Sequence, residues 1–324
     1  MKIDYETALI TEFECFDYRR FLVNFSKKHI FVCGGLVDIT KEPAPSFRDL
    51  FLRYCASVSE NEIIDSIILA ESFKDYFKES TYSDLLVFED EIANIATVVL
   101  IFLESPGSLV ELGMFCGKPH HYKKLLVVAP KEHTGSEDSF IYLGPLEHIR
   151  RKENTSVTIY PWPSNTVNNY DVEYLFDLKC LLLDKLRSSS KQISFQAENS
   201  GHVAFLIYEI IRLSYPILIG DIELALSALQ LDLSEGEIKR HIYLLTKTNM
   251  IDCNLYSTYK YYYPLYPSLK TINFGKTKDN KVKDSASIQM NINQSYILDD
   301  SDSAARKRRT AKKEINKKLS GEQQ

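Results

Sequence analysis

The residues best suited to chemistry lie between Glu104 and Glu111, where the sequence reads Glu-Ser-Pro-Gly-Ser-Leu-Val-Glu. An unbroken apolar run from Thr97 to Leu103 precedes them and is typical of a buried parallel strand. The Pro-Gly pair then predicts a sharp turn, Ser108 a helix cap, and Glu111 a place in the first helical turn. Open α/β sheets bind ligands at this end of their strands, so Glu111 is a candidate catalytic group. A purely structural capping box, Ser108-x-x-Glu111, remains the alternative.

Three further features belong to the same candidate site. The run from His29 to Cys33 ends in Gly34 and Gly35, whose backbone a sugar or phosphate could approach; a plain tight turn is the alternative. Arg48 falls in the first turn of a predicted helix, where the helix dipole favours anions. It is therefore either held ready for an anionic ligand or an ordinary surface residue. Glu71 follows another predicted strand and is a further candidate acid.

Strands and helices alternate over the first half of the chain. The alternation predicts a Rossmann-like parallel sheet flanked by helices, with right-handed connections. We place this domain at residues 1–165 and a helical connector at 166–200. The pattern predicts strands at 29–33, 63–70, 97–103, 125–129 and 156–160, and helices at 5–28, from Ser46 onward, at 82–96 and around Glu111.

The pattern changes at Gly201. Residues 201–270 contain three short helices with apolar stripes, the second capped by Asp221 and the third opened by the capping box Ser234-x-x-Glu237, and then a hairpin, which is the plan of a winged helix-turn-helix domain. Its cations and tyrosines suit phosphate contacts and base stacking, although a protein-binding module with a tyrosine-lined core would show the same pattern. The residues expected to contact nucleic acid are Lys239, Arg240, Tyr243 and Lys247 on the third helix and Lys260 on the hairpin.

The net charge of −5 hides an asymmetry. From Lys276 onward there are twelve Lys or Arg against seven Asp or Glu, so this part carries +5 and residues 1–275 carry −10. Residues 271–324 are therefore expected to form a basic, disordered tail, which either meets a polyanion or is simply solvated.

Cysteine usage and hydropathy predict where the protein resides. The six cysteines contain no CxxC pair, and the N-terminus does not resemble a signal peptide, so reduced thiols in the cytoplasm are expected. The apolar runs are too short to cross a bilayer, so no membrane contact is expected. No zinc motif is present, and the adjacent pair His120 and His121 is poorly spaced for chelation from one helix face. We therefore predict no metal and no cofactor.

Three segments carry a resemblance to a known family: Phe31 to Gly35, Glu104 to Gly113, and Ser139 to Pro145. They are similar to nucleoside deoxyribosyltransferases, and more narrowly to bacterial retron effectors that join such a domain to a winged-helix module. The likeness covers residues 25–155 in motif and reaches about residue 270 in architecture. Two departures are Glu89, where the family often has aspartate, and the Gly-Ser-Leu-Val-Glu loop, where the classical enzymes often have another small residue and an aromatic.

The resemblance implies N-glycosidic chemistry. Glu111 matches the glutamate that attacks the anomeric carbon, and Glu89 matches the acid that protonates the departing base. A carboxylate below the sugar can capture an oxocarbenium-like carbon, and a retaining reaction of this kind places two carboxyl groups about 5 Å apart. The residues expected to bind the substrate are Cys33, Gly34, Gly35, Arg48, Glu71, Ser105, Gly107 and Ser108.

The resemblance also implies a biological role and partners. The chain is expected to be the toxic effector of a retron anti-phage system that cleaves a nucleotide-type substrate, with NAD as one candidate. A retron reverse transcriptase and its RNA–DNA hybrid, the multicopy single-stranded DNA, would restrain it, and an oligomer is expected. Two alternatives stay open. One is a nucleotide-sensing winged-helix regulator that binds DNA without catalysis, and the other is a degenerate scaffold for oligomer assembly.

Overall fold

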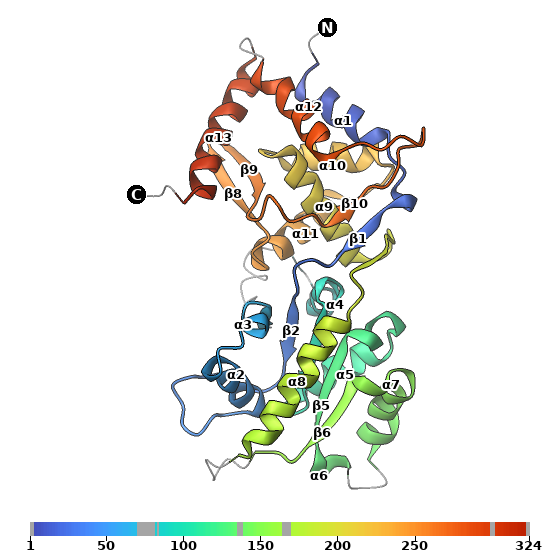
Figure 1. Cartoon of the computed structure of the whole chain (residues 1–324), viewed down its shortest axis with the longest axis vertical. Coiled ribbons are helices and arrows are strands. Elements are labelled where there is room, and N and C mark those ends of the chain that lie inside the picture. The colour runs from blue at the N-terminus through green and yellow to red at the C-terminus, as the bar shows by residue number, and fades with distance from the viewer. Residues whose placement is uncertain are drawn as a thin grey trace. The chain divides into compact units, whose positions relative to one another are not determined.

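A computed structural model describes residues 3–69, 82, 84–134, 139–163, 170–298 and 302–321. The chain folds into two compact units (Figure 1). The sheet unit consists of Lys27–Lys74 and Ile92–Ser190, and the helical unit of Met1–Ser26, Asp75–Glu91 and Lys191–Gln324. The residue contacts thus do not divide the chain at residue 165, because the N-terminal residues belong to the same unit as the C-terminal half.

The sheet unit is built on a five-stranded parallel sheet with strand order β3-β2-β4-β5-β6. A parallel sheet flanked by helices is confirmed, and the apolar runs explain it, since all residues of β2, β4 and β5 are buried. The second expected strand is shorter than predicted and follows a helical turn. The strands are β2 (Ile30–Cys33), β3 (Ile67–Leu69), β4 (Val98–Phe102), β5 (Leu125–Pro130) and β6 (Val157–Tyr160).

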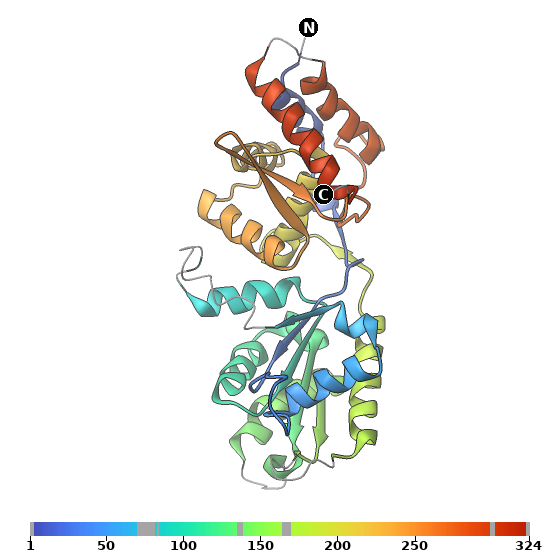
Figure 2. The ribbon, with the colours of Figure 1, turned by 90° about the vertical axis from the view of Figure 1, so that its left-hand side faces the viewer.

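Helices cover both faces of this sheet; Figure 2 shows α2 and α8 on one side and α5 and α7 on the other. The α2 and α8 side shares one apolar core with Ile30, Val32 and Phe102. The segment expected as a connector is therefore α8, an integral part of the sheet unit. The helices are α2 (Phe47–Ser57), α3 (Asn61–Ile64), α5 (Pro106–Cys116), η3 (Pro119–Lys124), α6 (Lys131–Thr134), η4 (Tyr142–Leu146), α7 (Glu147–Lys152), η5 (Asn154–Ser156) and α8 (Val172–Ser188).

The strand order creates a topological switch point between β2 and β4. From β2 the chain goes outward to β3 at one edge, and it then returns through α4 (Leu85–Ile95) to pair β4 with the other side of β2. The segments that leave β2 and β4 therefore diverge at the carboxyl ends of these two strands. In open α/β sheets this divergence opens the crevice in which ligands bind.

The helical unit contains a three-stranded antiparallel sheet, with order β10-β1-β7, and a separate hairpin of β8 and β9. The single helix expected at 5–28 is wrong, because Asp17 starts a short 3-10 turn and the chain then enters a strand. The elements are α1 (Tyr5–Glu14), η1 (Tyr18–Arg20), β1 (Leu22–Asn24), β7 (Gln192–Ser194), α9 (Ser200–Ser214), α10 (Ile219–Ala228), α11 (Glu235–Lys247), β8 (Ile251–Tyr256), β9 (Tyr259–Pro264) and β10 (Ile272–Asn273), followed by α12 (Ser285–Ile297) and α13 (Ser303–Leu319).

The capping signals of this unit are partly as expected. Ser234 caps α11, and its hydroxyl and the Glu237 carboxylate form the predicted capping box. Asp221, in contrast, is the third residue of α10 rather than its cap, and its carboxylate accepts a hydrogen bond from the N–H of Leu218 at 2.8 Å. A carboxylate reaching back to the cap position stabilises the helix start in the same way, so the helix is found although its cap is shifted.

The C-terminal segment differs from the disordered tail that its composition predicts. α12 and α13 occupy most of it, and Ile288, Ile292 and Tyr296 of α12 are buried. α13 packs through Ala311 and Ile315 against the tyrosines of the hairpin. The residues beyond about 275 thus supply apolar contacts at helical spacing, which offset the cost of ordering a highly charged segment. No helix in the described ranges combines the length and the apolar character needed to cross a bilayer.

Candidate active site

Glu104 organises the switch point. It follows β4 directly, and its carboxylate accepts three backbone hydrogen bonds: from Gly35 at 2.9 Å, from Phe47 at 2.7 Å and from Arg48 at 3.1 Å. Burial raises the pKa of Glu104, against these three N–H donors and the charge of Arg48, which lower it. One side chain therefore joins the end of β4 to the turn after β2 and to the first turn of α2, which Ser46 caps.

The double glycine is required by close packing around this carboxylate. Gly34 has a φ of +153°, and a Cβ atom built on it would lie 3.0 Å from Cδ of Arg48 and from Cβ of Phe102. A Cβ on Gly35 would lie 2.7 Å from Cβ of Ser46 and 3.0 Å from the Glu104 carboxyl carbon. The turn is thus a tight one, which was the structural alternative, and it also brings the backbone to the edge where a ligand would lie.

Gly35→Ala is expected to lower the free energy of unfolding by about 1–3 kcal/mol, because the new methyl group overpacks a site whose neighbours are short and fixed. Chemical denaturation would measure this loss. Gly113→Ala is the matched control: Gly113 lies inside α5, and a Cβ atom added there would meet no neighbour within 4 Å, so the same change should stabilise slightly. Equal effects at the two positions would contradict the close packing described for Gly35.

The start of α5 differs from the expected capping box. Ser105 is the N-cap; its hydroxyl accepts from the N–H of Ser108 at 3.1 Å, and the Ser108 hydroxyl accepts from the N–H of Ser105 at 3.1 Å. Ser108 is therefore the third helical residue, Gly107 the second, and Glu111 the sixth. The structural role assigned to Glu111 as a capping-box partner is thus wrong.

Glu111 projects from α5 on the face of the sheet opposite α2. Residues alternate along β2, so Cys33 points away from the core that Val32 shares with α2. Sγ of Cys33 and a carboxylate oxygen of Glu111 lie within 4.8 Å of each other. Cys33 is buried and Glu111 is half-buried. The structure thus brings together two of the predicted site residues, at the end of β2 and beside the switch point.

The remaining predicted residues of this site are placed as follows. Arg48 is buried in the first turn of α2, beside Gly34 and Glu104. It is therefore not the ordinary surface residue that was its alternative. Glu89 is a buried residue of α4, and Glu71 lies outside the described residues.

A cavity of about 670 Å³ borders Glu104 on the α2 side of the switch point. Of the predicted substrate-binding residues, Gly35 and Ser105 line it. Trp162 and Tyr170 form an aromatic wall, with ring centroids 5.0 and 5.1 Å from that of Phe47. Its volume is within the usual range for small-molecule sites. Glu104, Trp162 and Tyr170 were not predicted as site residues; Glu104 could have been found as the acid directly after a buried strand.

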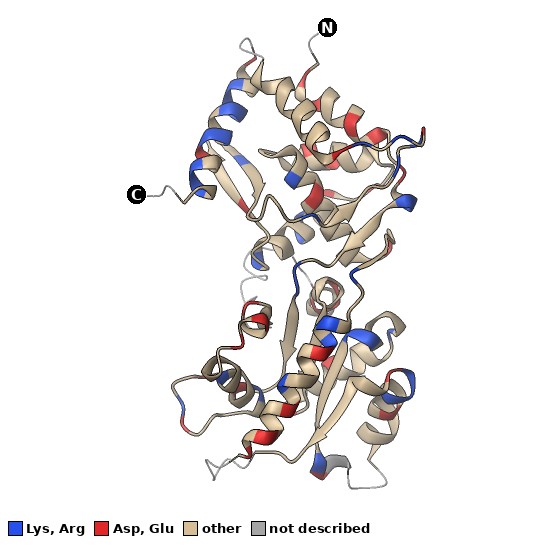
Figure 3. Ribbon diagram, in the orientation of Figure 1, with Lys and Arg blue, Asp and Glu red and all other residues tan. Residues whose placement is uncertain are grey.

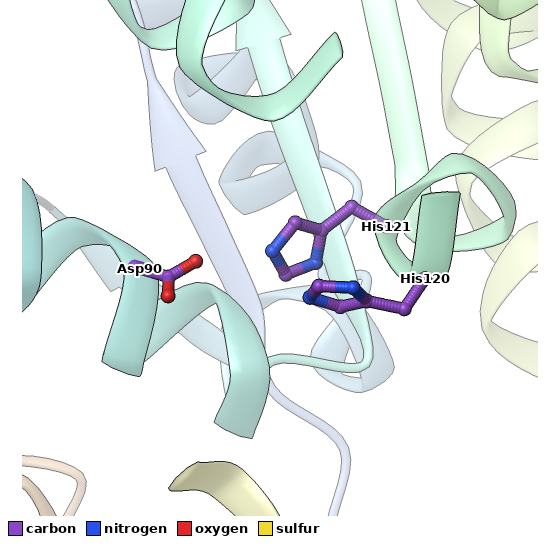
Figure 4. A group of neighbouring side chains, drawn as sticks. All are labelled: Asp90, His120 and His121. Atoms are coloured by element: carbon purple, nitrogen blue, oxygen red, sulfur yellow. The ribbon is translucent and has the colours of Figure 1, made fainter. Parts of the chain in front are cut away.

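The adjacent histidines lie in η3, the 3-10 helix that precedes β5. The imidazole rings of His120 and His121 lie side by side, with centroids 4.1 Å apart (Figure 4). His121 is buried and also meets the ring of Phe115 edge-on at 5.6 Å. Both residues lie in a 3-10 helix, whereas the spacing argument was made for one face of an α-helix.

The residues expected to contact nucleic acid are more engaged than predicted. Arg240 pairs with Glu91 at 3.2 Å, and Lys239 with Glu235 at 2.6 Å. Tyr243 is buried rather than exposed, and the ammonium of Lys247 lies 5.4 Å from the centre of its ring. The hairpin places Lys260 on its surface but buries three tyrosines, so part of the aromatic pattern belongs to a tyrosine-lined core. These three are Tyr261, Tyr262 and Tyr263.

Comparison with known proteins relates this architecture to a family. Residues 44–253, more than half of the chain, match the model of the STM3845 retron effector protein. The chain belongs to this family. The matched range begins just before α2 and ends within β8, so it includes β4, α5 and the helices α9 to α11 of the helical unit, but not β2. The resemblance to retron effectors is thus confirmed, and with it a role in retron defence.

Two curated relatives of this retron effector come from Escherichia coli. One, named "Retron Ec86 putative ribosyltransferase/DNA-binding protein", is 28% identical over 180 residues, which are 55% of each chain. The other, named "Retron Ec73 putative ribosyltransferase/DNA-binding protein", is 29% identical over 136 residues, 40% of each chain. The alignments therefore span about half the length of these relatives. Both names are consistent with an enzyme of the glycosyl-transfer type.

Proposed function

We propose that this retron effector cleaves the N-glycosidic bond of a nucleotide-type substrate, with Glu111 as the nucleophile and NAD as one candidate. The observation that carries the proposal is the position of Glu111. It faces the end of β2 beside the switch point, with the Cys33 thiol within 4.8 Å of its carboxylate. The half-buried carboxylate thus lies at the edge where open α/β sheets present catalytic groups to a ligand.

The reaction would take two steps. The Glu111 carboxylate attacks the anomeric carbon, the C–N bond breaks, and its electron pair leaves with the base. A purine or pyrimidine takes a proton from the carboxylic acid of Glu89, whereas the nicotinamide of NAD leaves as a neutral base without one. Water then attacks the same carbon, the ester bond to Glu111 breaks, and Glu89 accepts the proton of the water. The products are the free base and the sugar phosphate, and both carboxyl groups return to their starting state; with NAD, the proton taken from the water passes on to solvent.

The substrate would bind to the Gly34-Gly35 turn and to the cavity, both of which border Glu104. Gly34 and Gly35 let the sugar approach the backbone, and Ser105 lines the cavity. Ser105 donates to the carbonyl of Gly34 at 3.2 Å, so the two elements are already joined before a ligand arrives. The part of the nucleotide farther from the reacting carbon would stack against Trp162 and Tyr170.

We further propose that a retron reverse transcriptase and its RNA–DNA hybrid restrain the effector until a phage triggers release, and that the effector acts as an oligomer. The names of the two Escherichia coli relatives, which combine a ribosyltransferase with DNA binding, support a nucleic-acid partner. Toxicity of the released enzyme would follow from loss of its nucleotide substrate.

The direct test is to incubate the full chain with NAD, ribonucleotides and deoxyribonucleotides and to separate freed bases by chromatography. Release of nicotinamide or another base supports the proposal. No release from any of them, together with sequence-specific binding to duplex DNA, would instead identify a regulator that senses nucleotides without catalysis.

A further inference from the structure

α13 has a buried face at regular helical spacing. Ala305, Arg308, Ala311 and Ile315 recur every three or four residues, and all four are buried. Ala311 and Ile315 pack on the hairpin tyrosines, and Arg308 pairs with Asp221 at 3.1 Å. The rotation of this helix about its axis is therefore fixed, and so is the face that it turns to solvent.

The solvent face of α13 is a row of cations. Arg306, Lys313 and Lys317 are exposed, and at 100° per residue they lie opposite the buried face. Figure 3 shows the basic residues along this helix. From the first to the last, the row extends about 16 Å, which is roughly five nucleotide steps of a duplex. Within the described part of the chain, no carboxylate pairs with any of the three.

The other charged groups of α13 are already engaged. The carboxylate of Glu314, which is the acid of this helix, accepts from the amide of Asn254 at 2.7 Å. The ammonium of Lys312 donates to the carbonyl of Tyr215 at 3.1 Å, and burial lowers its pKa to about 7. On α11, by contrast, Lys239 and Arg240 pair with acids, and Lys247 lies over the ring of Tyr243. α13 therefore carries a row of exposed cations, and α11, the helix expected to contact nucleic acid, does not.

The hairpin next to α13 adds groups that suit nucleic acid. Lys307 of α13 lies over the ring of Tyr259, 4.7 Å from its centre. Tyr259 is 40% exposed at the start of β9, and Lys260 beside it is exposed as well. An exposed aromatic ring among cations can stack on a base or a sugar while the cations meet phosphates. Recognition of an acidic peptide would need the cations but no exposed ring for stacking, so these groups favour a nucleic acid.

We propose that the solvent face of α13, together with Tyr259 and Lys260, holds the phosphate backbone of the nucleic-acid partner. The proposal rests on the proposed function, in which an RNA–DNA hybrid restrains the effector, and it moves the main contact from α11 to α13. Contacts of this kind follow phosphate geometry and charge, so binding should be strongly dependent on salt and only weakly dependent on sequence.

The test compares two variants of the full chain with the same charge change. The variant Arg306→Gln/Lys313→Gln/Lys317→Gln removes the row, and Lys270→Gln/Lys276→Gln/Lys281→Gln removes three exposed lysines of the same unit elsewhere. Binding to a 20-base-pair RNA–DNA hybrid duplex is measured over a range of salt concentrations. Loss of three phosphate contacts should weaken binding about 100-fold at 0.1 M salt and reduce the slope of log K against log salt by about 2.7. The control variant should leave both the affinity and the slope of log K against log salt nearly unchanged.

Two outcomes would overturn the proposal. In the first, both variants weaken binding equally, which would show a response to net charge and not to α13. In the second, vesicles containing anionic lipid bind as tightly as the duplex and lose binding with the same variant, which would make the row a membrane-surface contact. Base release is measured separately, so a failure of nucleic-acid binding at α13 is distinguishable from a failure of the proposed glycosidase activity.

Discussion

Replacing Glu111 by glutamine is expected to abolish base release and, with it, toxicity in cells. Glutamine keeps the size and the hydrogen-bonding capacity of the side chain but cannot form the covalent bond to the anomeric carbon. Loss of a catalytic nucleophile costs about 10³-fold or more in turnover, because the remaining groups only bind and polarise the substrate. The measurement is base release, followed by chromatography, from the substrate that the incubation described above identifies.

The matched control is Glu173→Gln, since Glu173 is an exposed residue of α8 in the same sheet unit. It makes the same chemical change away from the switch point and should leave turnover unaltered. Circular dichroism and thermal melts of both variants would verify that the fold is retained. Full turnover by the folded Glu111→Gln variant would refute the role of this side chain, and toxicity that persists without turnover would mean that another property of the effector kills the cell.

The parallel sheet could be predicted because its signal is local. Continuous apolar runs such as Val98–Phe102 and Leu125–Pro130 occur where strands are buried on both faces, and each strand is followed by turn residues. The edge at which Gly35 and Ser105 lie follows from the direction of parallel strands. The sequence does not show in the same way that β2 and β4 pair and so bring these residues together, because no local pattern tells which strands become neighbours.

The details around Glu104 were missed for this reason. Its three backbone donors belong to segments that lie between 56 and 69 residues away in the chain. The four-residue pattern Ser108-x-x-Glu111 leaves a capping box open as the structural alternative, because the pattern itself carries no information on where the strand ends. Since β4 ends at Phe102, the turn is reached earlier and Ser105 takes the cap position. The cap thus lies three residues before Ser108, and this excludes the capping alternative for Glu111.

The C-terminal helices were missed because composition treats every Lys and Arg as solvated. Arg308 is instead buried between distant partners: its guanidinium donates to the carbonyl of Pro216 and to Asp221, and its carbon lies 3.4 Å from the centre of the Tyr5 ring. Tyr5 lies near the other end of the chain. No local pattern can foresee that a residue near the N-terminus and one near position 221 will enclose a cation from the C-terminal segment.

Arg308→Met is therefore expected to lower the free energy of unfolding of the helical unit by about 3–5 kcal/mol. Methionine fills much of the space next to Tyr5, but the carboxylate of Asp221 is left buried without its cation, and this is the costly part. Denaturant titration would measure the loss, and hydrogen exchange would show α13 losing its protection. Arg306→Met, two residues away on the exposed face, is the matched control and should change stability by no more than about 0.5 kcal/mol.

A second variant tests whether the unpaired Asp221 carboxylate causes the loss of stability in Arg308→Met. If the buried charge of Asp221 is what destabilises the variant, Asp221→Asn added to Arg308→Met should recover part of the stability, although Asp221→Asn alone destabilises. A coupling free energy of about 1–3 kcal/mol between the two positions is expected. Additive effects would show that Arg308 stabilises α13 through its contacts with Tyr5 and the Pro216 carbonyl and not through Asp221. Rapid exchange of the amides of residues 303–319 in the unaltered protein would contradict the docked helix, and the segment would then be the disordered arm that its composition predicts.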